Sequence, residues 1–315
     1  MKIALFYASW EAFGEPWSTP QGVRWELEAR GHEVTPYNLY HNNGEFLPKK
    51  KARTYSGDCF NRFNNDYKNG GYRPDGLIVM DYGPYDYVGM DKQYFPDVPF
   101  ILEAGDTPQS FSHHARKLSK FHAVVTPDAR AADQFATMGI HSEWMNHWAD
   151  ERIFHDRYDV EPIYDVVSTC GGRRVTAAMQ ESLGERFNNE RYFYGEDHAK
   201  RLLLGHIVFQ CSQYGEITRR IFEGMACGRM MLTDRLAPET RINELFTEGE
   251  DIVYYDSAED AIDKVNYYTA HPEERDRIAA NGKRKVLEQH TVASRVDLFE
   301  SVIKQIQNEF VGTTS

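Results

Sequence analysis

Short apolar runs alternate with amphipathic stretches along the chain, and this alternation limits the fold more than any other feature of the sequence. Buried strands of a parallel sheet read as apolar runs, and the helices that connect them carry one apolar face. The runs predict strands at residues 2–7, 32–36, 76–80, 98–102, 124–125, 164–168, 207–210, 230–233 and 251–255. The pattern therefore predicts an α/β fold built from βαβ units.

Capping and proline signals place several helices between these strands. Pro20 stands where a helix begins and Gly31 where it ends. Asp128 suits an N-cap, because its carboxylate can accept the free amide hydrogens of a first turn. Further helices are expected at 217–227, from Pro272 onward and at 292–310.

The length of 315 residues favours two domains, at roughly 150 residues for each. The strand–helix rhythm breaks into charged, turn-prone sequence at 149–162, so the domains are expected at 1–150 and 151–315. Their two α/β sheets would face each other across a cleft, and the last helix could pack back on the first domain. Residues 41–73 are polar without a clear period and read as an insertion or loop in the first domain.

Composition excludes several classes of protein. The net charge of −12, from 36 basic and 48 acidic residues, argues against a general nucleic-acid coat. No apolar run approaches the roughly 20 residues of a membrane span, which predicts a cytoplasmic protein. The 4 cysteines show no CxxC spacing, so reduced thiols are expected rather than disulfides or a zinc site.

The segment 218–228 is the most informative for chemistry. It reads as a helix whose N-terminus offers free amides and a partial positive charge, a natural seat for phosphate oxygens. Arg219 and Arg220 add guanidinium donors, and Glu223 lies about one turn further on, placed to accept from sugar hydroxyls. An ordinary amphipathic helix with solvated arginines is the alternative.

Five ordered motifs carry a family resemblance. They are Arg-x-Phe-Glu-x-Met-Ala-Cys-Gly at 220–228, Met-Leu-Thr-Asp-Arg at 231–235, Glu-Leu-Phe-x-x-Gly-Glu at 244–250, His-Pro-Glu-Glu-Arg at 271–275 and Ile-Ala-x-x-Gly at 278–282. Together they resemble the nucleotide-sugar half of GT-B glycosyltransferases, closest to the CgeB-like (spore maturation) and group 1 families. The resemblance covers residues 160–300 well and the first half more weakly.

The resemblance implies a GT-B fold of two facing Rossmann-like domains, with the donor bound by the second. It implies transfer of a hexosyl or pentosyl group from a nucleoside diphosphate sugar, of the UDP type, to an acceptor hydroxyl, with no cofactor and no metal. Glu223 would hold the ribose or sugar hydroxyls and Arg220 would face the pyrophosphate. Arg173, after Gly172 in a Gly-Gly turn, resembles the family's phosphate-facing basic residue; a surface arginine beside a turn is the alternative.

One departure from the family concerns stereochemistry. Many retaining relatives carry two glutamates separated by seven residues, the second equivalent to Glu223. Here the first position is Gly215, and the nearest acid, Glu216, comes one place late. Retention of the anomeric configuration therefore does not follow from the sequence.

In the first half, Asp106, His113 and His114 follow a predicted strand, where α/β folds place ligands. Any of the three could deprotonate an acceptor hydroxyl. An ordinary turn aspartate is the alternative for Asp106, and adjacent histidines face different ways, so at most one is expected to act. Adjacent positions seldom converge on one ion, so they are not expected to bind metal.

Two further groups of residues concern the acceptor. The loop at 8–19 follows the first strand and offers a glycine and three aromatic side chains for stacking on a sugar or base, or alternatively for the core; these are Trp10, Phe13, Gly14 and Trp17. A basic cluster in the polar insertion could contact DNA, as in phage enzymes that glycosylate modified bases, or be simply solvated; it consists of Lys49, Lys50, Lys51 and Arg53.

The sequence leaves one other function open and disfavours a second. A non-catalytic nucleotide-sugar-binding protein fits the missing paired glutamate. A Rossmann dehydrogenase is disfavoured, since no GxGxxG stands between the first strand and helix.

Overall fold

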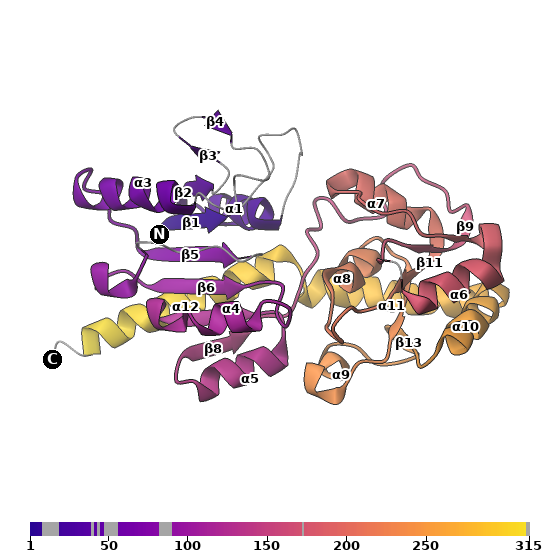
Figure 1. Cartoon of the computed structure of the whole chain (residues 1–315). Helices are drawn as coiled ribbons and strands as arrows, with labels where there is room; N and C mark the ends of the chain where they lie inside the picture. Colours follow the sequence, from indigo (N-terminus) through magenta and orange to yellow (C-terminus); the bar gives the residue numbers. More distant parts are fainter. Residues whose placement is uncertain are drawn as a thin grey trace. The chain divides into compact units, whose positions relative to one another are not determined.

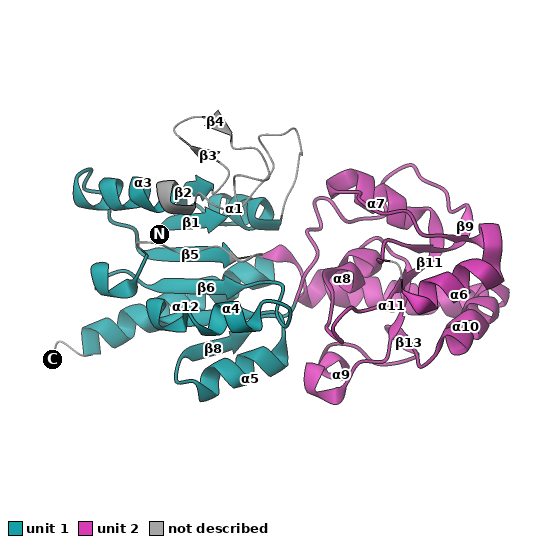
Figure 2. Cartoon of the chain, viewed as in Figure 1, with its two compact units in different colours: residues 1–146, 293–315 teal, residues 147–292 magenta. Residues whose placement is uncertain are grey.

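The chain forms two α/β units, each with its own parallel sheet (Figure 1). The computed structural model describes residues 1–7, 19–38, 41–42, 45–46, 56–81, 90–171 and 173–312. Unit 1 comprises residues 1–146 and 293–315, and unit 2 comprises residues 147–292 (Figure 2).

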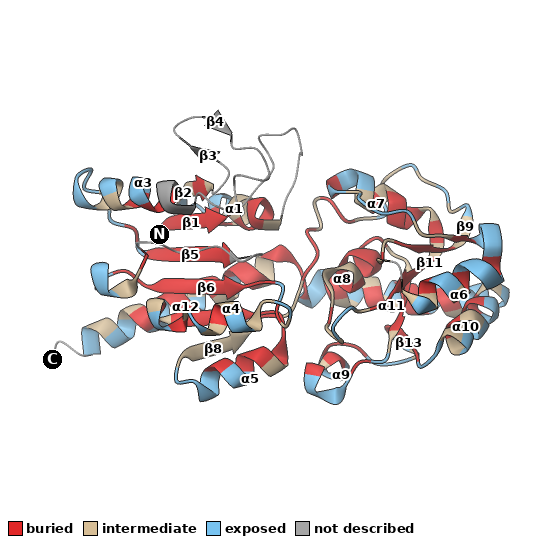
Figure 3. Cartoon of the chain, in the orientation of Figure 1, coloured by how far each residue is buried: buried red, intermediate tan, exposed pale blue. Residues whose placement is uncertain are grey.

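Unit 1 is built on a sheet of six parallel strands in the order β2-β1-β5-β6-β7-β8. Its strands are β1 (Lys2–Tyr7), β2 (Glu33–Asn38), β5 (Gly76–Asp81), β6 (Phe100–Ala104), β7 (Ala123–Thr126) and β8 (His141–Trp144). The short strands β3 (His41–Asn42) and β4 (Glu45–Phe46) pair separately. The inner strands β1, β5, β6 and β7 are almost wholly buried (Figure 3), as apolar runs in a sheet covered on both faces should be, whereas the edge strands β2 and β8 are mostly half-buried.

The helices of unit 1 follow the strands in βαβ order. They are α1 (Thr19–Ala29), α3 (Ser56–Lys68), α4 (Phe111–Ala115), α5 (Ala129–Thr137) and α12 (Val292–Gly312), with 3₁₀ turns η2 (Lys92–Tyr94) and η3 (Leu118–Lys120). As the sequence predicts, Asp128 caps α5 by accepting from the amide of Ala131 at 3.0 Å.

Helix α12 belongs to unit 1 although it follows the whole of unit 2 in the chain. A Cβ on Gly76 in β5 would lie 2.7 Å from Cδ1 of Ile303, so any larger residue there would force the Ile303 side chain of this helix to shift. Polar contacts add to the packing. Glu300 pairs with His32 at 2.8 Å and with Arg30 at 3.4 Å.

The structure differs from the sequence expectation within 41–73. Residues 56–68 form helix α3 rather than a loop. Phe60 and Phe63, three residues apart, lie on one helical face and are fully buried with Phe6 of β1, at ring-centroid distances of 5.1 and 5.5 Å. Few apolar residues are enough here because aromatic rings bury a large area each.

Unit 2 contains a sheet of five parallel strands in the order β10-β9-β11-β12-β13. Its strands are β9 (Tyr164–Ser168), β10 (Phe187–Asn188), β11 (Gly205–Gln210), β12 (Met230–Asp234) and β13 (Val253–Tyr255). Its helices are α6 (Arg174–Leu183), α7 (Gly195–Leu203), α8 (Arg219–Ala226), α9 (Ile242–Leu245), α10 (Ala258–Ala270) and α11 (Pro272–Gln289), with 3₁₀ turns η4 (Gly184–Arg186) and η5 (Pro238–Thr240).

The packing of α11 explains one glycine of the sequence motifs. A Cβ on Gly282 would lie 2.7 Å from the carbonyl oxygen of Asp251, so the helix approaches backbone there. Pro272 stands at the first turn of α11, where its missing N–H costs nothing. Within the described ranges, no helix combines the length and apolarity needed to cross a membrane.

Candidate functional site

Most of the donor-binding residues predicted for the second half of the chain lie beyond the carboxyl ends of β9 and β11 in unit 2. The two strands are parallel neighbours, with Ser168 opposite Phe209 in the register. Past these positions the chain turns into loops that lead to α6 and α8. Ligands of open α/β sheets bind at this edge, because helix N-termini and loops converge there.

Two guanidinium groups converge on the turn after β9. A Cβ built on Gly171 would lie 3.8 Å from Nη1 of Arg173 and 3.8 Å from Nη1 of Arg191. Nε of Arg173 is buried and has no hydrogen-bond partner within the described chain. Among the described residues, Arg173, Arg191 and Arg220 form no ion pair with a carboxylate, whereas Arg186 of the same unit does. Cationic groups held together without counter-charges favour binding of an anion.

Helix α8 brings a third guanidinium to the same region. The hydroxyl of Thr218, the N-cap residue, makes no cap hydrogen bond, so no side chain of the cap occupies the first-turn amides. The pKa of Cys170, beside the turn, is lowered by a hydrogen bond with the Cys211 thiol and, against the effect of burial, by the charge of Arg220. The positive field of α8 therefore reaches the end of β9.

Arg219, predicted to face the donor, lies over the ring of Trp148, with 4.9 Å between its Cζ and the ring centroid. This cation–π contact holds the guanidinium against a buried aromatic side chain. Of the two arginines of the motif, Arg220 is therefore the better candidate for an anion ligand.

Glu223 is buried, with 4% of its surface exposed, and faces a histidine that no sequence motif indicates. Nδ1 of His198, on α7, lies 3.7 Å from Oε2 of Glu223. Burial lowers the pKa of His198, Glu223 opposes this effect and Arg220 adds to it, so the neutral imidazole is favoured. His198 and Glu223 lie on two different helices, α7 and α8, and meet only through the packing of these helices. No local sequence motif indicates this contact.

Glu216 is engaged by its own loop. Its carboxylate accepts from the amides of Gln213 at 3.2 Å and Tyr214 at 2.5 Å. Gly215 beside it has φ of +65°, which favours glycine. The carboxylate thus stabilises the turn that leads into α8.

In unit 1, the predicted acceptor-side residues surround the end of β6. Asp106 is exposed directly after the strand, with φ of +50°, an uncommon conformation for a non-glycine residue. His114 is fully buried, and its Nδ1 lies 3.3 Å from Oγ1 of Thr107. His113 is half-buried, and its Nε2 lies 2.8 Å from Nζ of Lys117. Of the three candidates, only Asp106 has an exposed side chain.

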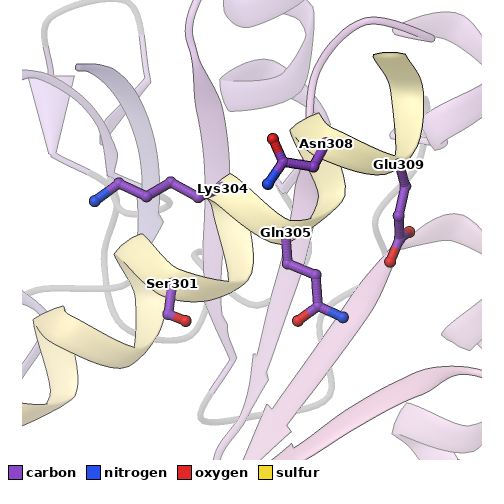
Figure 4. A pocket seen from close by; sticks show the side chains of 5 residues that line it. All are labelled: Ser301, Lys304, Gln305, Asn308 and Glu309. Carbon is purple, nitrogen blue, oxygen red and sulfur yellow. The ribbon is translucent and has the colours of Figure 1, made fainter. Parts of the chain in front are cut away.

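Several predicted residues lie outside the described residues. They are Trp10, Phe13, Gly14, Trp17, Lys49, Lys50, Lys51, Arg53 and Gly172. Within the part of the chain that is described, no three His, Cys, Asp or Glu side chains are grouped to hold a metal ion. A shallow depression of unit 1 lies along α12 and is lined by Ser301, Lys304, Gln305, Asn308 and Glu309. Its side chains spread along the helix, and none belongs to the predicted site (Figure 4).

Comparison with known proteins identifies the fold. Residues 152–301 match the family described as "Glycosyl transferase-like". No curated protein sequence matches the chain. Sucrose-phosphate synthase from Thermosynechococcus elongatus superposes with a TM-score of 0.64 at 12% identity, covering 99% of both chains. HepE from Anabaena, solved with UDP-glucose, also gives 0.64 at 12% identity, over 96% of this chain and 99% of its own.

A third similar structure is an alpha-glucosyltransferase solved with UDP and a 13-mer DNA containing an HMU base. It superposes with a TM-score of 0.57 at 10% identity, over 96% of this chain and 99% of its own. These structures have the GT-B fold, so the predicted fold class is confirmed. The CgeB-like subgroup stays a prediction.

Proposed function

We propose that the protein transfers a sugar from a nucleoside diphosphate sugar to an acceptor hydroxyl, because residues 152–301 match a glycosyl transferase-like family and the chain has a GT-B fold. UDP is the proposed nucleotide, because similar structures were solved with UDP-glucose or UDP. A hexosyl or pentosyl group is the proposed cargo.

The observation that carries the proposal is a set of arginines in unit 2 that form no ion pair with any carboxylate of the described residues. Arg173 and Arg191 converge on Gly171, and the charge of Arg220 reaches Cys170 in the same turn. A diphosphate matches this arrangement, since guanidinium groups bind phosphate oxygens with paired N–H donors. The uncapped first turn of α8 adds amide donors.

These groups would stabilise the departing diphosphate. In the proposed reaction the bond between the anomeric carbon and the β-phosphate oxygen breaks, and a bond from that carbon to the acceptor oxygen forms. Negative charge grows on the leaving oxygen, where fixed cationic donors are most effective. We propose that these donors replace a divalent ion and that Glu223 accepts a hydrogen bond from a ribose or sugar hydroxyl.

The acceptor proton needs a base, and Asp106 is the proposed one. Its side chain is exposed at the carboxyl end of β6 in unit 1, the edge at which such sheets bind ligands. A carboxylate at that position can take the proton as the acceptor oxygen attacks. Asp106→Asn should lower kcat strongly while leaving the affinity of unit 2 for UDP unchanged.

Thermal stabilisation by UDP, GDP and ADP, and by UDP-glucose, tests the donor site. Wild type is compared with Arg220→Ala and Glu223→Ala, and with Arg284→Ala as a matched arginine control that pairs with Glu288 on an exposed face. One nucleotide should stabilise wild type and the control but neither site variant. Losing a charged hydrogen bond costs about 1.5–3 kcal/mol, roughly a 10- to 150-fold rise in Kd.

The same variants separate ribose from sugar as the ligand of Glu223. If Glu223 accepts from the ribose, Glu223→Ala weakens UDP and UDP-glucose alike; if it accepts from the sugar, only UDP-glucose is weakened. Release of UDP in the presence of an acceptor panel then distinguishes an enzyme from a protein that only binds nucleotide sugars. Absence of binding by every nucleotide at millimolar concentration would refute the proposal.

DNA is a second candidate acceptor. A GT-B structure similar to this chain was solved with DNA, and the sequence carries three adjacent lysines at 49–51. Phosphate contacts by these residues predict duplex binding that weakens steeply with salt. Replacing all three by Ala should weaken binding to every DNA sequence, and absence of binding at low salt would exclude this acceptor.

A further inference from the structure

We infer that His198 is a positioning residue that orients the Glu223 carboxylate for the donor, an inference that rests on the function proposed above. His198 lies on α7 and Glu223 on α8, and both side chains are largely buried. Nδ1 of His198 faces Oε2 of Glu223 at 3.7 Å, so the imidazole acts on one carboxylate oxygen.

The imidazole is itself held from two other segments. Oγ1 of Thr169, just past the end of β9, lies 3.4 Å from Nε2 of His198. The ring of Phe154 meets the imidazole edge to face, with 5.7 Å between centroids and 88° between the planes. Contacts on both nitrogens and one face leave the ring little freedom, which is what a positioning residue requires.

The charges around the ring select one tautomer. The charged groups that face it are Glu223 and Arg220, both on α8, while Thr169 and Phe154 carry no charge. A neutral imidazole that accepts the Thr169 hydroxyl hydrogen at Nε2 keeps its own hydrogen on Nδ1. That N–H then points toward the Glu223 carboxylate. Thr169, His198 and Glu223 form an ordered chain from the end of β9 to α8.

A neutral imidazole orients Glu223 without cancelling its charge. The carboxylate keeps its full strength as an acceptor, and the oxygen that His198 does not face stays available to a donor hydroxyl. A protonated histidine in the same place would compete with the donor for Glu223. The alternative to this inference is that His198 only fills space between α7 and α8.

A double-mutant cycle separates the two roles, because a residue that acts through Glu223 shows non-additive effects while a space-filling residue does not. The affinity for UDP and UDP-glucose is measured for wild type, His198→Leu, His198→Asn, Glu223→Gln and His198→Leu/Glu223→Gln. Asparagine retains an N–H donor near the Nδ1 position, and leucine retains volume without it. His206→Asn is the matched control, a half-buried histidine at the start of β11.

We expect His198→Leu to raise the Kd of the donor about tenfold, His198→Asn to stay within about threefold of wild type, and the control to have no effect. In the Glu223→Gln background, His198→Leu should add less than about twofold. An equal loss in both backgrounds would overturn the inference. If His198→Leu does not fold, Thr169→Val provides the same test: it should weaken the donor only where Glu223 is present.

The binding data also distinguish a failure of the proposed function from a failure of the inference about His198. A wild-type protein that binds none of UDP, GDP, ADP and UDP-glucose would overturn that function and this inference together. A wild type that binds nucleotide, with His198 variants that bind it equally well, would overturn the inference alone.

Discussion

Replacing Arg191 by Gln tests the anion site at a residue that no sequence motif indicates. Arg191 is exposed and its guanidinium lies beside that of Arg173 over Gly171, so removing it should leave the fold intact. Two unit charges about 4 Å apart interact by about 1 kcal/mol in water and about 4 kcal/mol at an effective dielectric constant near 20. Because Arg191 is exposed, its interaction energy with a phosphate should lie toward the lower end of this range. Losing Arg191 is therefore expected to cost about 1–2 kcal/mol of binding free energy, a 5- to 30-fold rise in the Kd of UDP.

Isothermal titration with UDP and uridine, at about 50 mM and 300 mM salt, measures this effect. Because Arg191 is exposed, the difference between wild type and Arg191→Gln should shrink at the higher salt. Uridine carries no phosphate and should bind both proteins equally. Arg186→Gln is the control, an exposed arginine paired with Asp165 before β10. Equal weakening of UDP and uridine, or equal effects of Arg191→Gln and the control, would refute the assignment of Arg191 to a diphosphate.

Three further outcomes concern stability. Gly282→Ala should cost about 1–3 kcal/mol in a thermal melt, because the new methyl group meets the Asp251 carbonyl oxygen. Burial and the charge of a nearby lysine lower the pKa of His122 to about 4, and its Nδ1 accepts from the Phe100 amide. Between pH 6.5 and about 4, His122 therefore binds a proton more readily in the unfolded chain than in the folded chain. The free energy of unfolding should fall as the pH drops through this range, and it should fall less in His122→Asn. Glu300→Gln should lower the melting temperature by removing the carboxylate that pairs with three basic side chains, and a variant that melts like wild type would contradict this role.

Much of the fold could be predicted because its signals are local. Apolar runs mark the strands, and capping residues such as Asp128 and Pro272 mark helix starts. Helix α3 escaped prediction, because its apolar residues are few and its composition is polar. The edge strand β10, of only 2 residues, is too short to produce a run.

The residues of the candidate site could be predicted where they share one sequence segment, but not where they come from separate segments. Arg220 and Glu223 share a motif on α8, so sequence alone connects them. Arg191 and His198 come from the loop after β10 and from α7, and only the parallel order of the sheet brings them to the same edge. Arg219 shows the reverse: the motif suggested a ligand, and Trp148 lies beneath its guanidinium.

The place of α12 in unit 1 has a consequence for how the protein is made. The ribosome completes residues 1–146, then the 146 residues of unit 2 (147–292), and only afterwards the helix that covers Gly76 in β5. At about 5–20 residues per second, that delay is roughly 7–30 s. Unit 2 is formed by one continuous chain segment, so it can fold as it leaves the ribosome. During that time the face of β5 that Ile303 will contact has no helix on it. Synthesis therefore reverses the order of the two units: the first to be translated is the last to be finished.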